Sequence, residues 1–266
     1  MLGSPLVADP AAPLARAHPL AKLGAALVLM FVLFVSVDAV TSGLILAAVT
    51  VALPFGGLGA GPLARRLGPL ALAAAGIGLF NALFSADPRG VALLAAGPLH
   101  LTDRSLAAGA AVGLRIAGIA ATGILCVGTI DPTDLADALV QHLRASPRFV
   151  VGALAAWRLA PLFGNEWIVI GLARRARGIE ADRGPLRIAA FPGRTFTLLV
   201  GAIRRATRLA LAMDARGFGQ RPCRTVARPR AISRADIALV AGAVAVALAA
   251  TAISVALGTW RPLLGG

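Results

Sequence analysis

Five apolar runs dominate the sequence and limit the folds that it can adopt. They lie at residues 23–37, 40–58, 68–85, 105–129 and 236–257. A helix needs roughly 20 predominantly apolar residues to cross a bilayer, with a usable range near 17–25. The first run reaches that range only if Leu20 or Ala39 is added to it. The sequence therefore predicts an all-α polytopic membrane protein with about five transmembrane helices.

Composition supports this class of protein. The mean hydropathy is +0.82 and only 14% of the residues are charged, whereas a soluble domain carries about 25% charged residues. The second run follows the first at once, which favours a hairpin of spans over a cleavable secretory signal. The segment 90–101 is too short to span and is expected to be interfacial or re-entrant.

The basic residues predict which side of the membrane each loop faces. The N-terminal segment, with Arg16 and Lys22, and the turn at 59–67, which holds two arginines, are expected to be cytoplasmic. The turn after the first run carries only Asp38, and the charges of the loop 86–104 balance. Both are therefore expected to be external.

Most of the positive charge lies in one insertion before the last run. Residues 131–235 hold 18 Arg against 7 acidic residues, which places +11 of the net charge of +14 there. Such charge often indicates nucleic-acid binding, but no soluble basic domain is separable, and the chain has no Tyr to stack on bases. The predicted organisation is a cytoplasmic N-terminal segment at 1–19, four spans within 20–129, a cytoplasmic region at 130–235, and a last span with an external tail at 236–266.

The insertion is expected to form three helices. The first opens with DPTDLADALVQHL, where Asp131 or Thr133 can cap a helix that ends near Arg144. The second covers 147–178 and the third 193–216. Both of the longer helices are apolar in the middle and become basic towards the C-terminal end.

The two longer helices end in the same pattern, Ala-x-x-Ala-Arg-Gly, at 173–178 and 212–217. A Gly after the last turn suits a left-handed cap, and an Arg there is stabilised by the helix dipole. The alanines make the last turn thin beside the Arg, which suits insertion of a guanidinium into a groove on another protein. The predicted docking residues are Ala176, Arg177, Gly178, Ala215, Arg216 and Gly217.

Several segments together resemble the T component of energy-coupling factor (ECF) transporters, the EcfT/CbiQ-like family. The segments that resemble the family are RAHPLAKL at 16–23, DPTDLADAL at 131–139 and AMDARGF at 212–218. The resemblance covers nearly the whole chain except the residues before about 15 and the loop 180–192. Of the two Arg motifs, the second, in AMDARGF, is quite specific, and the first, at 173–178, is less so.

This resemblance implies a transmembrane scaffold subunit of an ATP-driven importer. Arg177 and Arg216 would seat the ends of two coupling helices in two cytoplasmic ATPase subunits, identical or different. A separate membrane-embedded S component would bind the substrate, a vitamin or a metal ion such as cobalt. The chain itself would be no enzyme and would bind no cofactor, because ATP binds to the partner subunits. It would lie in the plasma membrane of a prokaryote with its N-terminus in the cytoplasm.

Two other functions compete with this interpretation. A permease subunit of an ordinary ABC importer presents one coupling helix with a Glu-Ala-Ala…Gly loop, of which Glu180, Ala181 and Gly184 are only a fragment. An intramembrane lipid-modifying enzyme would need an acidic cluster, and the spacing of Asp131, Asp134 and Asp137 fits one helical face. The Gly and Arg that accompany such enzyme motifs are absent, so these acids are interpreted as charges at a helix N-terminus.

A few isolated residues carry no assigned role. Arg115, about ten residues into an apolar run, is either functional or hydrogen-bonded between helices. Asn81 is expected to be a contact between helices. Glu166 either pairs with Arg158 or marks a break near Gly164. Asp214 either orients Arg216 or faces a partner's groove. No metal site is predicted, because His18, His100 and His142 are scattered along the chain. Cys126 and Cys223 form no metal-binding or disulfide pattern.

Overall fold

The computed structural model describes residues 9, 11–84, 92–96, 99–179, 190–219, 226 and 228–260, with only the backbone described for 92–96 and 99–101. The chain forms two compact units, one from residues 1–135 with 230–266 and the other from residues 136–229. The first unit contains α1 (Pro13–Arg16), α2 (Pro19–Val35), α3 (Ala39–Ala52), a 3-10 turn (Pro54–Gly56), α4 (Ala60–Phe84), β1 (Ala92–Ala96), β2 (Leu99–Thr102), α5 (Asp103–Thr129) and α10 (Arg234–Ala256). The second contains α7 (Pro147–Ala176) and α9 (Phe191–Ala215), and α6 (Pro132–His142) begins in the first unit and continues into the second.

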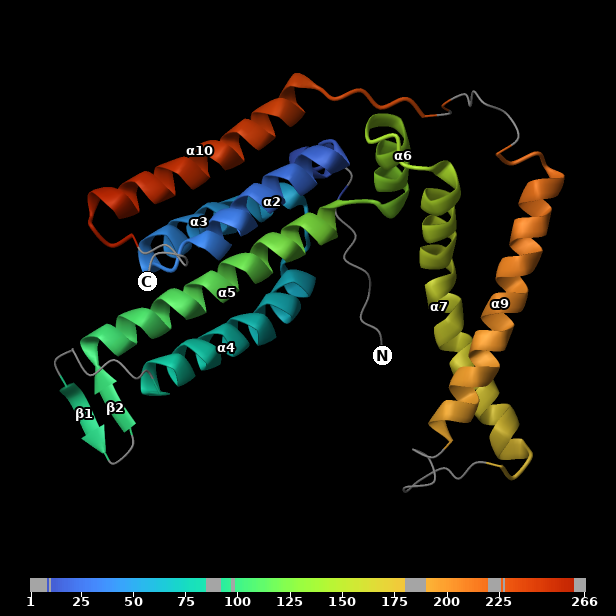
Figure 1. Cartoon of the computed structure of the whole chain (residues 1–266), viewed down its shortest axis with the longest axis horizontal. Coiled ribbons are helices and arrows are strands. Elements are labelled where there is room, and N and C mark those ends of the chain that lie inside the picture. Colours follow the sequence, from blue (N-terminus) through green and yellow to red (C-terminus); the bar gives the residue numbers. More distant parts are fainter. Residues whose placement is uncertain are drawn as a thin grey trace. The chain divides into compact units, whose positions relative to one another are not determined.

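The first unit is a bundle of apolar helices (Figure 1). Helix α5 packs against α4 on one side and against α2 and α3 on the other, while α10 packs against α2 and α3. Its core contains Leu33, Ile45, Val49, Ala121 and Ala250. Most buried positions of the bundle are small residues, which lets apolar helices approach closely in a membrane.

Within the described residues, three helices are long and apolar enough to cross a membrane. These are α4, α5 and α10, with 25, 27 and 23 residues, and the apolar helices α2 and α3 are shorter. All five predicted runs therefore coincide with helices, and the prediction of a largely helical, multi-pass membrane protein is confirmed. The second run is divided, because Pro54 starts a 3-10 turn that ends at the left-handed Gly57.

One boundary of the bundle differs from the sequence prediction. Arg65 and Arg66 were expected in a turn, but α4 already begins at Ala60 and includes both. Arg is a good helix former, and Pro62 fits the first turn, where its missing N–H is not needed. Pro69 lies inside the helix without ending it.

The segment expected at 90–101 overlaps two β-strands in an otherwise helical structure. Strands β1 and β2 pair in antiparallel fashion, with an irregularity between Ala92 and Leu94. The prediction of an interfacial or re-entrant piece did not anticipate strands, because a short apolar run does not distinguish a strand from a helix. Its depth in the membrane stays a prediction.

The insertion forms the three expected helices close to their expected limits. Asp131 is the residue that caps α6, since its Oδ1 accepts the N–H of Thr133 at 2.7 Å and that of Asp134 at 3.4 Å. Helix α7 is continuous through Pro161 and Gly164. The cytoplasmic location of this region stays a prediction.

Candidate functional site

The end of α7 is closed by backbone hydrogen bonds. Arg177 is the C-cap residue and Gly178 has a φ of 68°. The N–H of Gly178 donates to the carbonyl of Arg175 at 2.9 Å, and the N–H of Ile179 donates to that of Arg174 at 3.1 Å. This is a Schellman motif, in which a left-handed Gly satisfies carbonyls that the helix end leaves without partners.

The end of α9 has the same geometry. Arg216 is the C-cap residue and Gly217 has a φ of 72°. The N–H of Gly217 donates to the carbonyl of Asp214 at 2.9 Å, and the N–H of Phe218 donates to that of Met213 at 3.0 Å. The repeat in the sequence is therefore also a repeat in structure.

Helix α10 shows which part of the repeat the cap requires. It ends in the same motif, with Gly258 at a φ of 66° and the N–H of Thr259 donating to the carbonyl of Ser254 at 3.0 Å. Its C-cap residue is Leu257. The motif thus needs the Gly but not the Arg. Capping therefore explains Gly178 and Gly217, and the only local contribution of the two arginines is the modest stabilisation of a cation at a helix C-terminus.

The arginines of both ends face outward. The predicted docking residues Ala176, Arg177, Gly178, Ala215 and Arg216 are exposed, and Gly217 is partly exposed. Among the described residues, the guanidinium groups of Arg177 and Arg216 have no hydrogen bond or ion pair. Two unengaged cations, each beside a small residue, are thus presented at two helix ends.

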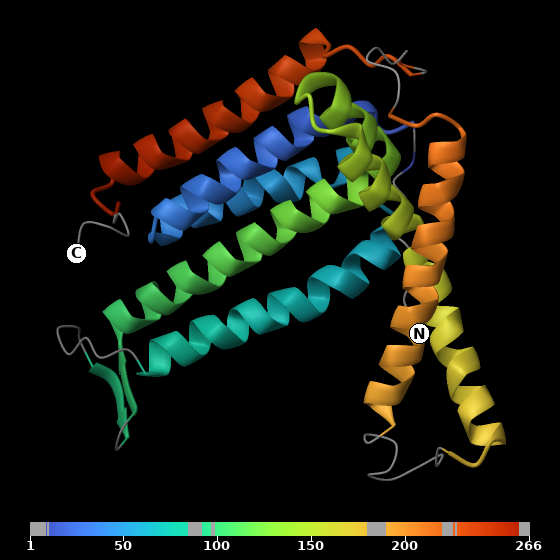
Figure 2. The ribbon, with the colours of Figure 1, turned by 45° about the vertical axis from the view of Figure 1, so that its right-hand side comes forward.

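Helices α7 and α9 cross each other and run in opposite directions (Figures 1 and 2). Near the end of α7, the ring of Trp167 lies 5.2 Å from that of Phe191, the first residue of α9. At the other end, Arg148 in the first turn of α7 lies beside Gly219, where a Cβ would be 3.1 Å from the Arg148 Nε. The C-terminus of each helix is therefore on the side where the other begins.

This arrangement separates the two Arg-Gly ends. Arg177 lies at one end of the crossed pair and Arg216 at the other. Because α9 has 25 residues and a helix rises about 1.5 Å per residue, its two ends are about 37 Å apart. The structure thus brings the two motifs into one helix pair but not into one site.

Glu166 holds the crossing together. Its carboxylate forms an ion pair with Arg205 of α9, and the Arg205 guanidinium also lies 5.8 Å from the centre of the Phe163 ring. The expectation of a break near Gly164 is wrong, because α7 continues through it. A Glu within an apolar stretch is therefore explained by a partner 39 positions away.

The middles of α7 and α9 expose large apolar side chains. They include Trp157, Leu162, Ile168 and Val169 on α7, and Phe196, Leu199 and Ile203 on α9. Exposed apolar area of this extent marks a contact surface or a membrane-facing surface. The two Arg-Gly ends therefore flank a helix pair that also has apolar surface to cover.

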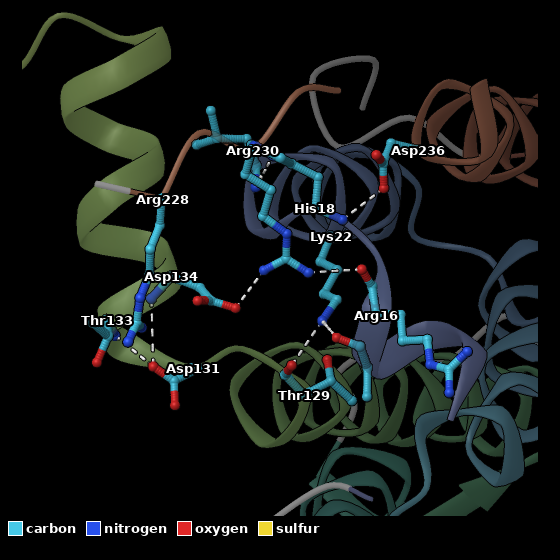
Figure 3. Close-up of polar contacts among 12 residues, drawn as sticks. Arg16, His18, Lys22, Thr129, Asp131, Thr133, Asp134, Arg228, Arg230 and Asp236 are labelled. Atoms are coloured by element: carbon cyan, nitrogen blue, oxygen red, sulfur yellow. Dashed lines mark hydrogen bonds and ion pairs between the residues drawn. The ribbon is translucent and has the colours of Figure 1, made fainter. Parts of the chain in front are cut away.

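A second polar arrangement lies in the first unit, where the chain leaves the bundle after α5 and re-enters it before α10 (Figure 3). The polar junction, as we name it, consists of His18, Lys22, Thr129, Asp134, Arg230 and Asp236. Lys22 is only 5% exposed and Asp236 only 4%. Burial of charged side chains is costly unless they are paired and hydrogen-bonded.

Each charge of the polar junction has such partners. The Lys22 Nζ donates to the carbonyls of Ala15 at 2.8 Å and Thr129 at 2.7 Å. Thr129 is the last residue of α5, so the cation also lies at the negative end of that helix dipole. Asp236 accepts the backbone N–H of His18 at 2.6 Å.

Arg230 joins the two chain connections. Its guanidinium forms an ion pair with Asp134 of α6 and donates to the carbonyl of Arg16 at 2.8 Å. The outgoing chain at Asp134 and the returning chain at Arg230 are thereby held together, 96 positions apart in sequence. Asp131 and Asp134, two of the acids weighed as an enzyme motif, are thus engaged in a helix cap and an ion pair.

Most contacts of the polar junction were not predicted from the sequence. Lys22 was interpreted as a topology signal and as part of the RAHPLAKL segment, and its burial as a hydrogen-bonded cation was not predicted. The signal that was available is the Ser233-x-x-Asp236 spacing, a capping box, which the structure contains. No pattern in the sequence pairs Arg230 with Asp134.

Arg115 forms a hydrogen bond between helices, one of the two roles that the sequence left open. Its Nη2 donates to the carbonyl of Phe34 at 2.6 Å, near the end of α2, and its guanidinium lies 5.4 Å from the centre of the Phe34 ring. Asp214 contributes its carbonyl to the cap of α9.

Among the residues that the structure describes, no group of His, Cys, Asp and Glu is arranged to hold a metal ion. The fragment at Glu180, Ala181 and Gly184, and Cys223, lie outside those residues.

The sequence profile of the cobalt transport protein family, CbiQ, matches residues 10–226, which include both Arg-Gly ends. The chain belongs to the CbiQ family. An energy-coupling factor transporter transmembrane protein EcfT of Heliobacterium modesticaldum is 32% identical over 152 residues, 54% of this chain and 57% of the relative. The EcfT of Listeria innocua is 34% identical over 139 residues, 48% of this chain and 52% of that relative.

A third relative of this CbiQ-family chain has a different name. It is an ABC transporter ATP-binding protein of Bifidobacterium longum, 29% identical over 170 residues, which are 60% of this chain and 22% of the relative. The chain spans about half the length of the EcfT relatives that it matches. The resemblance to the T component of ECF transporters is confirmed.

Proposed function

We propose that this chain is the T subunit of an ECF-type ABC importer and that its two Arg-Gly ends dock two ATPase subunits. The observation that carries the proposal is the pair of identically built ends at opposite ends of one crossed helix pair. Each presents an exposed Arg that its cap does not require. A planar guanidinium can bind a carboxylate or backbone carbonyls with two parallel hydrogen bonds.

The crossed pair offers a route for coupling. ATP-driven motion of two docked ATPases would act on the opposite ends of α7 and α9 and change their crossing. The apolar middles of both helices would transmit this change to a membrane-embedded S component that binds a vitamin or a metal ion. Binding of ATP and its hydrolysis would belong to the ATPase subunits, and this chain would be non-catalytic.

The charge distribution supports a matching location. With the basic insertion in the cytoplasm, the N-terminus is also cytoplasmic and the C-terminus external, in the plasma membrane of a prokaryote. A relative that is named an ABC transporter ATP-binding protein agrees with a role beside ATPases.

The test is co-purification of the chain with its ATPases, followed by ATPase and uptake assays. We compare the wild type with Arg177→Ala, Arg216→Ala and the double variant. Loss of a charge-assisted bidentate contact costs roughly 1.5–3 kcal/mol, about 10- to 150-fold in affinity for each end. We expect each single variant to weaken one ATPase contact and the double variant to abolish assembly.

Matched controls separate docking from general loss of charge. Arg158→Ala and Arg208→Ala remove exposed arginines from the same two helices and should leave assembly unchanged. The proposal is wrong if the double variant assembles and transports like the wild type.

A further inference from the structure

An apolar cavity of about 340 Å³ lies within the first unit, among α2, α3, α5 and α10. Its walls are mainly small side chains and include Ala25, Ala26, Ala48, Ala238 and Gly242. Ala238 and Gly242 are exposed, so the cavity is open to the surface along α10.

The polar groups in the cavity wall are engaged elsewhere. Thr122 Oγ1 donates to the carbonyl of Gly118 at 2.7 Å, and Thr129 Oγ1 to that of Leu125 at 2.8 Å. Lys22 Nζ donates to two carbonyls, as described above. A buried water needs two to four polar partners. The wall therefore suits hydrocarbon rather than water.

The cavity is elongated along the helices. On α10 its wall extends from Ala238 to Val246, a rise of about 12 Å at 1.5 Å per residue. On α2 it extends from Lys22 to Leu29. One end thus lies beside the polar junction and the other towards the middle of the bundle, which is the shape that a hydrocarbon chain parallel to the helices would fill.

The end beside the polar junction is basic. Four cations stand there, Arg16, Lys22, Arg230 and Arg234, and the nearby carboxylates of Asp131, Asp134 and Asp236 already accept hydrogen bonds. Arg234 is exposed and starts α10 one turn before Ala238, so both lie on the same face. Within the described residues its guanidinium has no hydrogen bond or ion pair.

Helix stability does not explain Arg234. A cation in the first turn faces the positive end of the helix dipole, which is unfavourable. An anion bound at this guanidinium would reverse that effect. We propose that the cavity binds one acyl chain of an anionic phospholipid, with the lipid phosphate at Arg234. This inference does not depend on docking of ATPases at Arg177 and Arg216.

The test uses native mass spectrometry of the full chain released from detergent. The protein is first equilibrated with equal amounts of phosphatidylglycerol and phosphatidylcholine that carry the same acyl chains. We expect the wild type to retain one phosphatidylglycerol in preference to phosphatidylcholine.

Two variants separate the acyl-chain site from the headgroup site. Gly242 lines the cavity, and a Cβ there would meet no atom within 4 Å. Gly242→Leu can therefore be accommodated and narrows the cavity, so it should lose both lipids. Arg234→Gln should keep a lipid but lose the preference for phosphatidylglycerol. The matched controls are Gly76→Leu, also at an open position in an apolar helix, and Arg104→Gln at the other end of α5, both expected to behave like the wild type.

Two results would overturn the proposal. Wild-type retention of lipid by Gly242→Leu would show that the cavity is not the site. An unchanged preference in Arg234→Gln would remove the headgroup assignment. If that retention in Gly242→Leu is accompanied by weaker association with a co-expressed membrane subunit, the cavity belongs to a partner helix instead.

Discussion

Arg177 and Arg216 occupy a position at which the fold accepts an apolar residue, since Leu257 stands at the same place in α10. Their guanidinium groups form no hydrogen bond or ion pair with the described residues and gain only the modest stabilisation of a cation at a helix C-terminus, whereas the following glycines close the helix. The glycines of the Ala-Arg-Gly motif therefore account for the conformation of the helix end, and the proposed docking role rests on the arginines. This separation makes an Arg substitution a test of docking rather than of folding.

Asp38 is a single residue on which two helix connections depend. It is 4% exposed, its Oδ2 accepts the N–H of Thr41 and the hydroxyl of Ser254, both at 2.7 Å, and its Oδ1 accepts the hydroxyl of Ser36. It thereby caps α3 and holds the turn after α2 to α10. Burial raises the pKa of Asp38, but these hydrogen bonds outweigh that effect, so its pKa lies below the ordinary value of 3.8.

We expect Asp38→Ala to lower the free energy of unfolding by about 1–3 kcal/mol, because it removes a helix cap and leaves buried hydroxyls without an acceptor. The depressed pKa means that the contribution is full above pH 3.8 and is lost as the pH falls below it. Melting in detergent as a function of pH measures both effects. Asp103→Ala, at an exposed helix start, is the control, and a constant difference between wild type and Asp38→Ala down to pH 3 would contradict the argument.

At the scale of elements, the contact between α4 and α5 depends on the absence of side chains. A Cβ at Gly78 would lie 2.7 Å from the carbonyl oxygen of Gly109, and a Cβ at Gly109 would lie 2.7 Å from the Cβ of Ala82. Gly109 and Gly113 form a Gly-x-x-x-Gly pattern, which permits close approach of membrane helices. Backbone atoms are the obstacles here, so the structure cannot adapt by moving a side chain.

We expect Gly109→Val to separate α4 from α5 and to destabilise the bundle by about 1–3 kcal/mol, the usual cost of overpacking. Thermal melting in detergent measures this as a lower Tm. The same substitution at Gly76, where a Cβ meets nothing within 4 Å, shows the cost of Val in a helix by itself. Equal effects of the two substitutions would mean that the close contact contributes nothing.

At the scale of the whole molecule, the second unit is attached through two connections, and the polar junction holds both. The chain leaves the first unit after residue 135 and returns at residue 230. The ion pair between Asp134 and Arg230 joins these positions, and both side chains are more than a third exposed. A paired attachment would make the two connections move together when force acts on the second unit.

We therefore expect Asp134→Asn to reduce coupled uptake while the assembled complex keeps its ATPase activity. A partly exposed ion pair contributes roughly 0.5–1 kcal/mol, which corresponds to a change of about 2- to 5-fold. Uptake per ATP hydrolysed is the quantity to measure, with Asp137→Asn in the same helix as the control. Unchanged uptake per ATP hydrolysed in Asp134→Asn would show that the ion pair between Asp134 and Arg230 has no role in coupling.

The sequence by itself determined the helices and most of their ends. The hydrogen bonds that form a helix and close its ends, including those at Gly178, Gly217 and Asp131, reach at most five residues along the chain. Local sequence patterns therefore contain the necessary information. The predicted start of α4 was wrong, and strands β1 and β2 were not predicted. In both segments the local propensities are ambiguous.

Only the tertiary structure decided which residues meet across long separations. Glu166 with Arg205, Lys22 with Thr129, and Arg230 with Asp134 are 39, 107 and 96 positions apart. These pairs depend on how whole helices pack, as do the cavity beside α10 and the placement of Arg177 and Arg216 at opposite ends of a crossed pair. Packing in this chain rests on many similar contacts between Ala, Gly and Leu, which are too alike in sequence to specify a partner until the helices are brought together.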